Sequence, residues 1–392
     1  MNHNKLKKIL LLVLIALILN VLRSYAGPDN LIRNNPSGDY CNWVVTPGKD
    51  HVAVLVNGQA YSRLKAEIDQ YNSDVEANFP VQLNIVQGNW INPDEVRATI
   101  KDLYHRKDID GIVLVGAIPM HRFYMHDFAN PNSLFFEDFD LKFVDSNDDG
   151  IADFYKGAPD LKVWVANLRG VENPLDQGID VLRAFLNKSH AYYSGKQTIE
   201  HRLLAVTGKD WPGGAAWFSV FMGETVFGKD NMDILGSEQV SSTSVLDAFR
   251  KHTYTMFYLQ VHSSATEQRM EGVSVSSAEI AEITTGALFT VNHGCSTGNW
   301  LKADAKGERN TAMSWVFGKS VGQAVVANVR TGMVYGQESL YERILAGDYL
   351  GSAYLACKKA AELEMHNGYP SGEIVAGVTF IGNPFIYIDP KK

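Results

Sequence analysis

A histidine and a cysteine each stand just after an apolar segment that reads as a buried strand. Residues 255–261 precede His262, and residues 287–291 lead through Asn292 to Cys295. A thiol needs a base to become a nucleophilic thiolate near neutral pH, and an imidazole supplies one. Because parallel strands of an open α/β sheet end at one crevice, both side chains are predicted to meet there. The pair indicates nucleophilic catalysis, and an inert core cysteine is the alternative.

Segments with the pattern of buried strands alternate with helical segments along the chain. Continuous apolar runs are typical of parallel strands, which are covered on both faces. Asn92 and Pro93 mark a helix start, because Asn caps a helix and Pro suits its first position. The order predicts an α/β fold with a mostly parallel sheet flanked by helices. Strands are predicted over residues 51–58, 81–86, 111–116, 161–166, 203–207, 255–261, 287–291 and 379–388, and helices over 61–78, 174–193 and 339–366.

The length of the chain indicates more than one folding unit. It has 392 residues, and about 150 residues per domain is typical. We expect an extension over residues 27–50, an N-terminal α/β sub-domain over 51–200 and a catalytic α/β sub-domain over 201–392.

Residues 1–26 have the pattern of a signal peptide. Lys5, Lys7 and Lys8 precede an apolar run over residues 9–22, and Ala26 ends a small-residue cleavage motif. The run is shorter than the roughly 20 residues that span a bilayer, which disfavours an uncleaved anchor. We therefore expect a periplasmic or secreted protein without stable membrane insertion.

Composition narrows the class of partner. The net charge of −8 argues against nucleic acid, because a phosphate backbone needs a basic surface. Three cysteines, Cys41, Cys295 and Cys357, leave at least one thiol unpaired within a monomer. Whether Cys41 pairs with Cys357 stays open, since spacing alone does not place two Cα atoms.

Residues 145–153 fit the first nine positions of a calcium loop. The predicted ligands are oxygens at alternate positions: Asp145, Asn147, Asp149, Ile151 and Asp153. Gly150 at the sixth position permits the sharp turn that such loops need. The twelfth position is Lys156 rather than Glu, so another carboxylate, Asp138 or Asp140, is expected to close the site. We predict a structural Ca²⁺, with a solvated acidic turn as the alternative.

Two motifs resemble those of the gingipain family of cysteine peptidases. Residues 261–264, Val-His-Ser-Ser, resemble the histidine motif, and residues 290–295, Thr-Val-Asn-His-Gly-Cys, resemble the cysteine motif. The resemblance extends over roughly residues 52–388. It implies a caspase-like fold, peptide or protein substrates, hydrolysis through a thioester, a His–Cys dyad and no catalytic cofactor.

By this resemblance Cys295 is the nucleophile and His262 the general acid/base. The backbone N–H groups of Ser263 and Cys295 are the expected oxyanion donors. His293 lies two residues before Cys295 and is an alternative base, but we favour His262 and expect His293 to line the cleft with Trp300. A zinc site built from His262, His293 and Cys295 is disfavoured.

The chain departs from the family pattern at two places. Ser263 replaces a glycine beside the histidine, so a Cβ must be tolerated there. Lys162 stands where the family tends to have an acidic residue that orients the histidine, and Asp160 is the nearest substitute. These departures suggest, as an alternative to a peptidase, a silent, calcium-stabilised binding protein. A transpeptidase or other cysteine hydrolase is a third possibility. The preferred substrate residue is not indicated.

Overall fold

The computed structural model describes residues 45–125, 128–170, 175–211, 213–214, 218, 222–236, 238–270, 272–332, 337–363 and 375–389. The predicted signal peptide, most of the extension and Cys41 lie outside these residues. No described helix is both long and apolar enough to cross a membrane.

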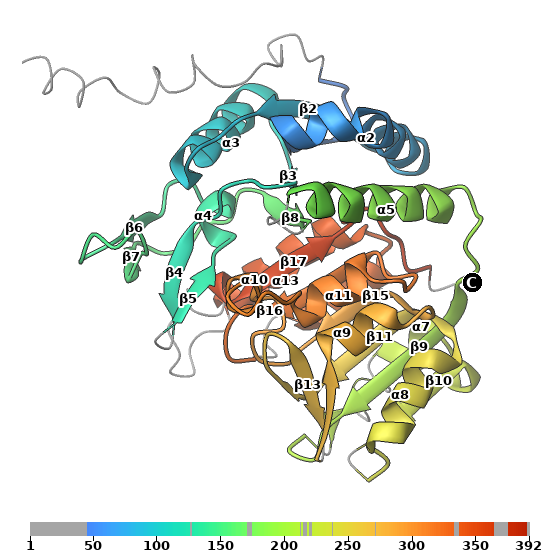
Figure 1. The fold of residues 1–392 in the computed structure, drawn as a ribbon. Helices are drawn as coiled ribbons and strands as arrows, with labels where there is room; N and C mark the ends of the chain where they lie inside the picture. The colour runs from blue at the N-terminus through green and yellow to red at the C-terminus, as the bar shows by residue number, and fades with distance from the viewer. Residues whose placement is uncertain are drawn as a thin grey trace, which may run out of the picture.

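A ten-stranded sheet forms the centre of the molecule (Figure 1). Its order is β10-β9-β11-β15-β16-β17-β8-β3-β1-β2, and every neighbouring pair is parallel except β16 with β17. The predicted mostly parallel α/β fold is therefore confirmed. In chain order the strands are β1 (Asp50–Asn57), β2 (Val81–Gly88), β3 (Gly111–Val115), β8 (Trp164–Leu168), β9 (Glu200–Thr207), β10 (Met232–Leu235), β11 (Thr253–Gln260), β15 (Gly286–Asn292), β16 (Ala324–Asn328) and β17 (Val378–Gly382).

Strand β17 joins the two halves of this sheet. Strands β2, β1, β3 and β8 come from the first half of the chain, and β10, β9, β11, β15 and β16 come from the second. Phe380 of β17 lies opposite Ala166 of β8 on one side and Val326 of β16 on the other. The sheet thus runs without a break from residues 51–200 to residues 201–392, and the division into two sub-domains stays a prediction.

Helices cover both faces of the sheet, as the alternation of strand β1 shows. Val52, Val54 and Val56 pack in one cluster with helices α2 and α5, whereas Ala53 and Leu55 pack in another with helix α3. Both faces are thus removed from water, which explains the continuous apolar runs. The helices are α2 (Gly58–Asn78), α3 (Pro93–Lys107), α4 (Leu134–Glu137), α5 (Leu175–Tyr193), α7 (Glu224–Val226), α8 (Ser242–Lys251), α9 (Ser277–Glu282), α10 (Trp300–Asp304), α11 (Thr311–Phe317), α12 (Gln337–Leu345) and α13 (Leu350–Leu363), with a 3₁₀ turn η5 (Lys229–Asn231).

Helix boundaries follow local signals. The Asn92 side chain accepts a hydrogen bond from the Glu95 N–H at 2.9 Å, and Pro93 is the first helical residue, as predicted. The single helix expected over residues 339–366 is instead two, α12 and α13, because the chain turns at Gly347 with φ of 90°. A positive φ is a conformation that glycine adopts readily and that ends a helix.

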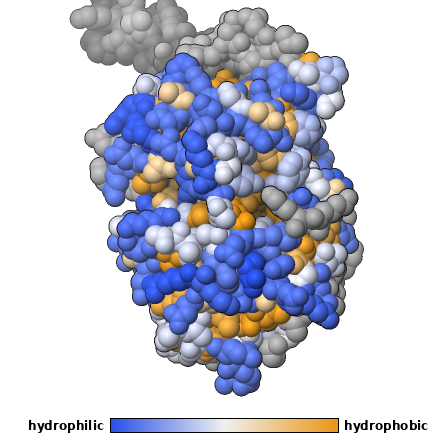
Figure 2. Space-filling view, turned by 90° about the vertical axis from the view of Figure 1, so that its right-hand side faces the viewer, coloured by the Kyte–Doolittle hydropathy of each residue, from blue (hydrophilic) through white to orange (hydrophobic). Residues whose placement is uncertain are grey.

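Three small antiparallel sheets are separate from the ten-stranded sheet. Strands β12 (His262–Ser263), β13 (Glu267–Met270) and β14 (Val273–Ser276) follow β11 directly. The others are the pairs β4 (Arg122–Met125) with β5 (Phe128–Pro131), and β6 (Lys142–Val144) with β7 (Phe154–Lys156). The face of the molecule drawn in Figure 2 is mostly hydrophilic, with smaller hydrophobic patches.

Candidate active site

His262 and Cys295 follow adjacent parallel strands at matching positions. Leu259 of β11 lies opposite Asn292 of β15, and each candidate residue stands three positions beyond its strand partner. The His293 N–H donates to the Leu259 carbonyl at 2.8 Å, which holds the two segments in register past the strand ends. Both residues therefore lie at the carboxyl edge of the sheet, where α/β proteins place their ligands.

His262 is paired with a carboxylate that the sequence analysis did not identify. Its Nε2 lies 2.6 Å from Oδ2 of Asp210, and the Trp211 ring packs on the imidazole with centroids 4.7 Å apart. Both members of the pair are accessible, since their side chains are 57% and 67% exposed. Asp210 follows strand β9, the other neighbour of β11. Its position after an apolar strand was a signal available in the sequence.

Asp160 does not perform the orienting role expected of it. Its side chain forms an ion pair with Lys162, and its N–H donates to Asp138 at 2.7 Å. These contacts belong to the segment before β8, whereas the carboxylate on His262 comes from the segment after β9. The suggested substitution of Asp160 for the family's acidic residue is therefore wrong, and Asp210 is the carboxylate in contact.

The Cys295 thiol is partly exposed and accepts a hydrogen bond from the Gly332 N–H at 3.2 Å. The turn that carries it is held by the Ser296 N–H, which donates to the Arg330 carbonyl at 2.6 Å. Ser296 has a φ of 58°, a conformation that is uncommon for a residue with a side chain. Among the described residues, no acceptor is bonded to the Cys295 N–H. The turn thus presents a thiol together with an uncommitted backbone donor.

Ser263 is accommodated by Gly294 on the facing segment. The Ser263 Oγ donates to the Cys295 carbonyl at 3.0 Å. A Cβ added to Gly294 would lie only 2.0 Å from that Oγ, so the missing side chain at position 294 makes room for the serine. Ser263 is also not among the described residues with positive φ. The Cβ beside the histidine is therefore tolerated without backbone strain.

The strand pairing of β12 orients a second backbone donor. The Ser264 N–H donates to the Glu267 carbonyl at 2.9 Å, and Ser263 lies opposite Gln268. In an antiparallel ladder, successive residues alternate between bonding the partner strand and pointing away from it. The Ser263 N–H therefore points away from β13.

His293 and Trp300 do not line an open cleft, contrary to expectation. His293 is 7% exposed and Trp300 1% exposed. The His293 Nδ1 lies 2.7 Å from the Gln337 side-chain nitrogen, and its ring packs against Tyr258 with centroids 5.1 Å apart. Burial lowers the pKa of His293 to about 3. The ring is therefore neutral at physiological pH, and its contacts are with residues of the core.

The acidic loop of residues 145–153 connects strands β6 and β7. Its carboxylates bond the loop itself: Asp145 Oδ2 accepts from the Gly150 N–H at 2.7 Å, and Asp153 Oδ2 accepts from the Ser146 N–H at 2.7 Å. Gly150 has a φ of 81° and makes the sharp turn that a calcium loop needs. Within the described residues, no three His, Cys, Asp or Glu side chains are already gathered as a metal-holding group.

The two carboxylates expected to close the loop have other partners. Asp138 is buried and accepts from the N–H groups of Asp140 and Leu141 at 3.0 and 3.1 Å. Asp140 forms an ion pair with Lys101 at 2.8 Å. Both carboxylates are therefore engaged in the segment ahead of the loop rather than turned to it.

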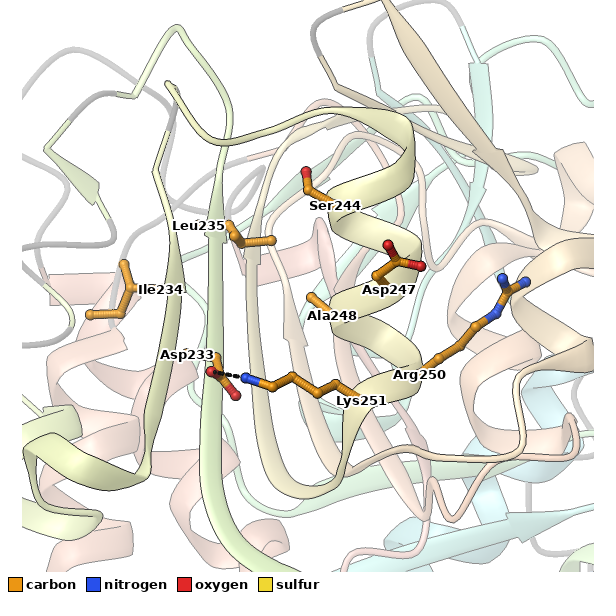
Figure 3. Close-up of a pocket in the computed structure, with 8 residues that line it drawn as sticks. All are labelled: Asp233, Ile234, Leu235, Ser244, Asp247, Ala248, Arg250 and Lys251. Carbon is orange, nitrogen blue, oxygen red and sulfur yellow. Dashed lines mark hydrogen bonds and ion pairs between the residues drawn. The ribbon is translucent and has the colours of Figure 1, made fainter.

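A pocket of about 400 Å³ lies elsewhere, between the edge strand β10 and helix α8 (Figure 3). Lys251 bridges it with an ion pair to Asp233 at 2.8 Å. It includes neither His262 nor Cys295, so it is separate from the candidate active site. Its lining is Asp233, Ile234, Leu235, Ser244, Asp247, Ala248, Arg250 and Lys251.

Solved structures share this fold, although no family model and no curated protein matches the chain significantly. Gingipain R, described as an Arg-specific cysteine proteinase, aligns over 88% of this chain and 80% of its own, with a TM-score of 0.61 and 10% identity. A structure described as a protease aligns over 86% and 78%, with a TM-score of 0.62 and 10% identity. At such identity the likeness concerns the fold. The chain therefore has the gingipain-like, caspase-type α/β fold that the motifs predicted.

Proposed function

We propose that this protein is an exported cysteine endopeptidase in which Cys295 is the nucleophile and His262 the general acid/base. The observation that carries the proposal is the matched placement of the two residues on adjacent strands. Each follows the register pair Leu259 and Asn292 by three positions, on the fold shared with a cysteine proteinase.

The surroundings of both side chains support these roles. Asp210 engages Nε2 of His262, so Nδ1 remains for exchanging a proton with substrate. The Gly332 N–H donates to the Cys295 sulfur, an interaction that favours the thiolate. In an unliganded site a nucleophile and its base need not be in hydrogen-bond contact, because such contacts tighten with substrate.

The reaction then follows from these atoms. His262 takes the thiol proton while the Cys295 sulfur attacks the peptide carbonyl carbon, and a tetrahedral oxyanion forms. The N–H groups of Ser263 and Cys295 donate to that oxygen. The C–N bond breaks, the amine leaves with the proton from His262, and a thioester remains. Water, deprotonated by His262, attacks the thioester, releases the acid and returns the proton to the thiol.

Site-resolved alkylation of the purified protein tests the dyad. Iodoacetamide labelling, read by mass spectrometry, should modify Cys295 far faster than the buried Cys357, and His262→Ala should remove the difference. A mixed peptide library run beside it should be cleaved by the wild type alone. If Cys295 is labelled slowly and at the same rate in the wild type and in His262→Ala, and no peptide is cleaved, the protein is a silent binding protein. Transfer of the acyl group to an added amine in preference to water would indicate a transpeptidase.

The proposal includes a structural Ca²⁺ in the loop of residues 145–153. Oxygens of Asp145, Asn147 and Asp149 stand at alternate positions around the turn at Gly150, which is the donor chemistry that Ca²⁺ prefers. Calcium should raise the unfolding temperature of the wild type but not of Asp145→Asn/Asp149→Asn. Asp140→Asn, next to the loop hairpin but paired with Lys101, is the control. An equal calcium-dependent rise in unfolding temperature for the wild type and the double variant would contradict a calcium site in this loop.

Export is the remaining part of the proposal. The charged and apolar pattern of residues 1–26 supports cleavage after Ala26 and release into the periplasm or the medium. Amino-terminal sequencing of protein recovered from those fractions should begin at Gly27. Recovery of the intact amino terminus in the membrane fraction would contradict release.

A further inference from the structure

Lys302 places an ammonium group beside the turn that carries Cys295. It lies on α10, whose first residue Trp300 follows the Cys295 turn closely, with Asn299 as the helix cap. The Lys302 Nζ is 3.4 Å from the Oγ of Ser296, the residue next to the nucleophile. The Nζ also lies over the Phe128 ring, 3.4 Å from its centroid.

Within the part of the chain that the structure describes, this ammonium has no acidic partner. Among the described residues, no carboxylate forms an ion pair with Lys302, whereas Lys101, Lys251 and Lys319 are all paired. Burial lowers the pKa of Lys302, whereas the neighbouring Cys295 acts to raise it. A partly buried cation that lacks a counter-ion gains free energy when an anion is brought to it.

Two arginines add positive charge at the same edge of the sheet. Arg169 follows β8 and Arg330 follows β16, and both side chains are buried. The Arg169 guanidinium lies over the ring of Trp300, 5.5 Å from its centroid, so it packs on the helix that carries Lys302. Arg169 therefore lies against the helix that carries Lys302, and Arg330 contacts the Cys295 turn through its carbonyl, which accepts from the Ser296 N–H.

We propose that Lys302 binds a carboxylate of the substrate, and that the enzyme cleaves after Asp or Glu. The inference rests on the proposed peptidase function. The acyl residue is the one attached to Cys295 in the thioester, so its side chain is nearest to the group beside that turn. A carboxylate there replaces Ser296 as the partner of the ammonium and forms an ion pair with it.

The anion site can be tested without peptide turnover. Iodoacetate and iodoacetamide deliver the same kind of alkylating carbon, but only iodoacetate carries a negative charge. The ratio of the iodoacetate rate to the iodoacetamide rate at Cys295 therefore reports a nearby cation. A change in thiol reactivity alters both rates alike and leaves this ratio unchanged. We expect Lys302→Gln to lower the ratio about 5- to 10-fold and Lys302→Glu to lower it further. Lys306→Gln, one turn onward and exposed, should keep the wild-type ratio. An unchanged ratio in Lys302→Gln overturns the proposal.

A peptide library then tests the substrate class. The wild type should cleave after Asp and Glu, Lys302→Arg should keep that preference, and Lys302→Glu should shift it towards Lys and Arg. Cleavage by the wild type after basic or apolar residues overturns this inference while the peptidase stands. If no peptide is cleaved, the peptidase proposal fails, and the iodoacetate ratio still decides whether Lys302 forms an anion site.

Discussion

His262 and His293, the histidines of the two sequence motifs, lie in opposite environments. His262 is more than half exposed and is paired with the equally accessible Asp210. His293 is closer in sequence, yet it is buried against Tyr258 and bonded to Gln337. A group that exchanges protons with a substrate must reach that substrate and must be able to take up the proton. The comparison shows that burial, rather than closeness in sequence, separates a candidate base from a core residue.

Replacing each histidine in turn should give the largest difference between the two positions. His262→Ala should lower kcat/KM for peptide cleavage by about 10²- to 10⁴-fold, the range typical of general acid–base catalysis. Its unfolding free energy should stay nearly unchanged, because the side chain is exposed. His293→Ala should instead cost about 1–3 kcal/mol of stability, since Gln337 loses a buried partner. Urea unfolding and steady-state kinetics measure both, and a reversed pattern would assign the base to His293.

The contact between the two segments predicts a second, smaller effect. Gly294→Ala places a Cβ only 2.0 Å from the Ser263 Oγ and must displace the turn that carries Cys295. A shift of about 1 Å can cost roughly 10²-fold in rate. Ser263→Gly in the same chain should restore most of that loss, because it removes the clashing side chain. Ser263→Gly alone is the control for the cycle. Additive losses in the double variant would contradict the clash.

The carboxylate on His262 should have a more modest effect. Exposed ion pairs contribute up to about 1 kcal/mol, so Asp210→Asn should lower kcat/KM about fivefold. The difference from wild type should shrink as salt is added, because the exposed Asp210 carboxylate interacts through solvent with the imidazolium that forms during the reaction. Asp160→Asn, which breaks the ion pair with Lys162, should leave the rate unchanged. A loss as large as that of His262→Ala would mean that Asp210 has a direct part in the chemistry.

The buried His293 and the partly buried His121 also predict how stability depends on pH. Burial lowers the pKa of both His293 and His121 to about 3, well below the ordinary value of 6.5. Protonation therefore favours the unfolded chain, so their contribution is complete above pH 6.5 and is lost as pH falls towards 3. Each adds up to ~1.4 kcal/mol per pH unit in that window. His121→Phe, beside Phe135 in the core, should reduce the slope measured by urea unfolding between pH 6 and 4. An unchanged slope would contradict the shift.

Much of this site could be predicted because its local signals are strong. The apolar runs before His262 and Cys295 are buried parallel strands, and adjacency of β11 and β15 places the residues at one edge. Asp210 was missed because strand order is a long-range property: only the structure shows that β9 neighbours β11. Asp160 is the carboxylate nearest to Lys162 in the sequence, whereas Asp210 is the carboxylate that contacts His262 in space.

The errors at His293 and Trp300 have a related cause. An extended segment sends alternate side chains to opposite sides, but the pattern does not say which side is open. The turn at Ser296, with its positive φ, redirects the chain after Cys295 and lets α10 bury Trp300. The need for a glycine at position 294 likewise could not be predicted, because it depends on the facing Ser263, which is distant along the chain.

Strand β17 has a consequence for how the chain reaches this structure. Phe380 pairs with Ala166, more than two hundred positions earlier, and closes the centre of the sheet. Contacts so distant along the chain slow folding, because a long loop must close before the pairing stabilises it. Until β17 is seated, β8 and β16 expose two apolar strand edges, which are sites for aggregation. We therefore expect insertion of this strand to be a late folding step, and the interval before it to be when a chain most needs a chaperone.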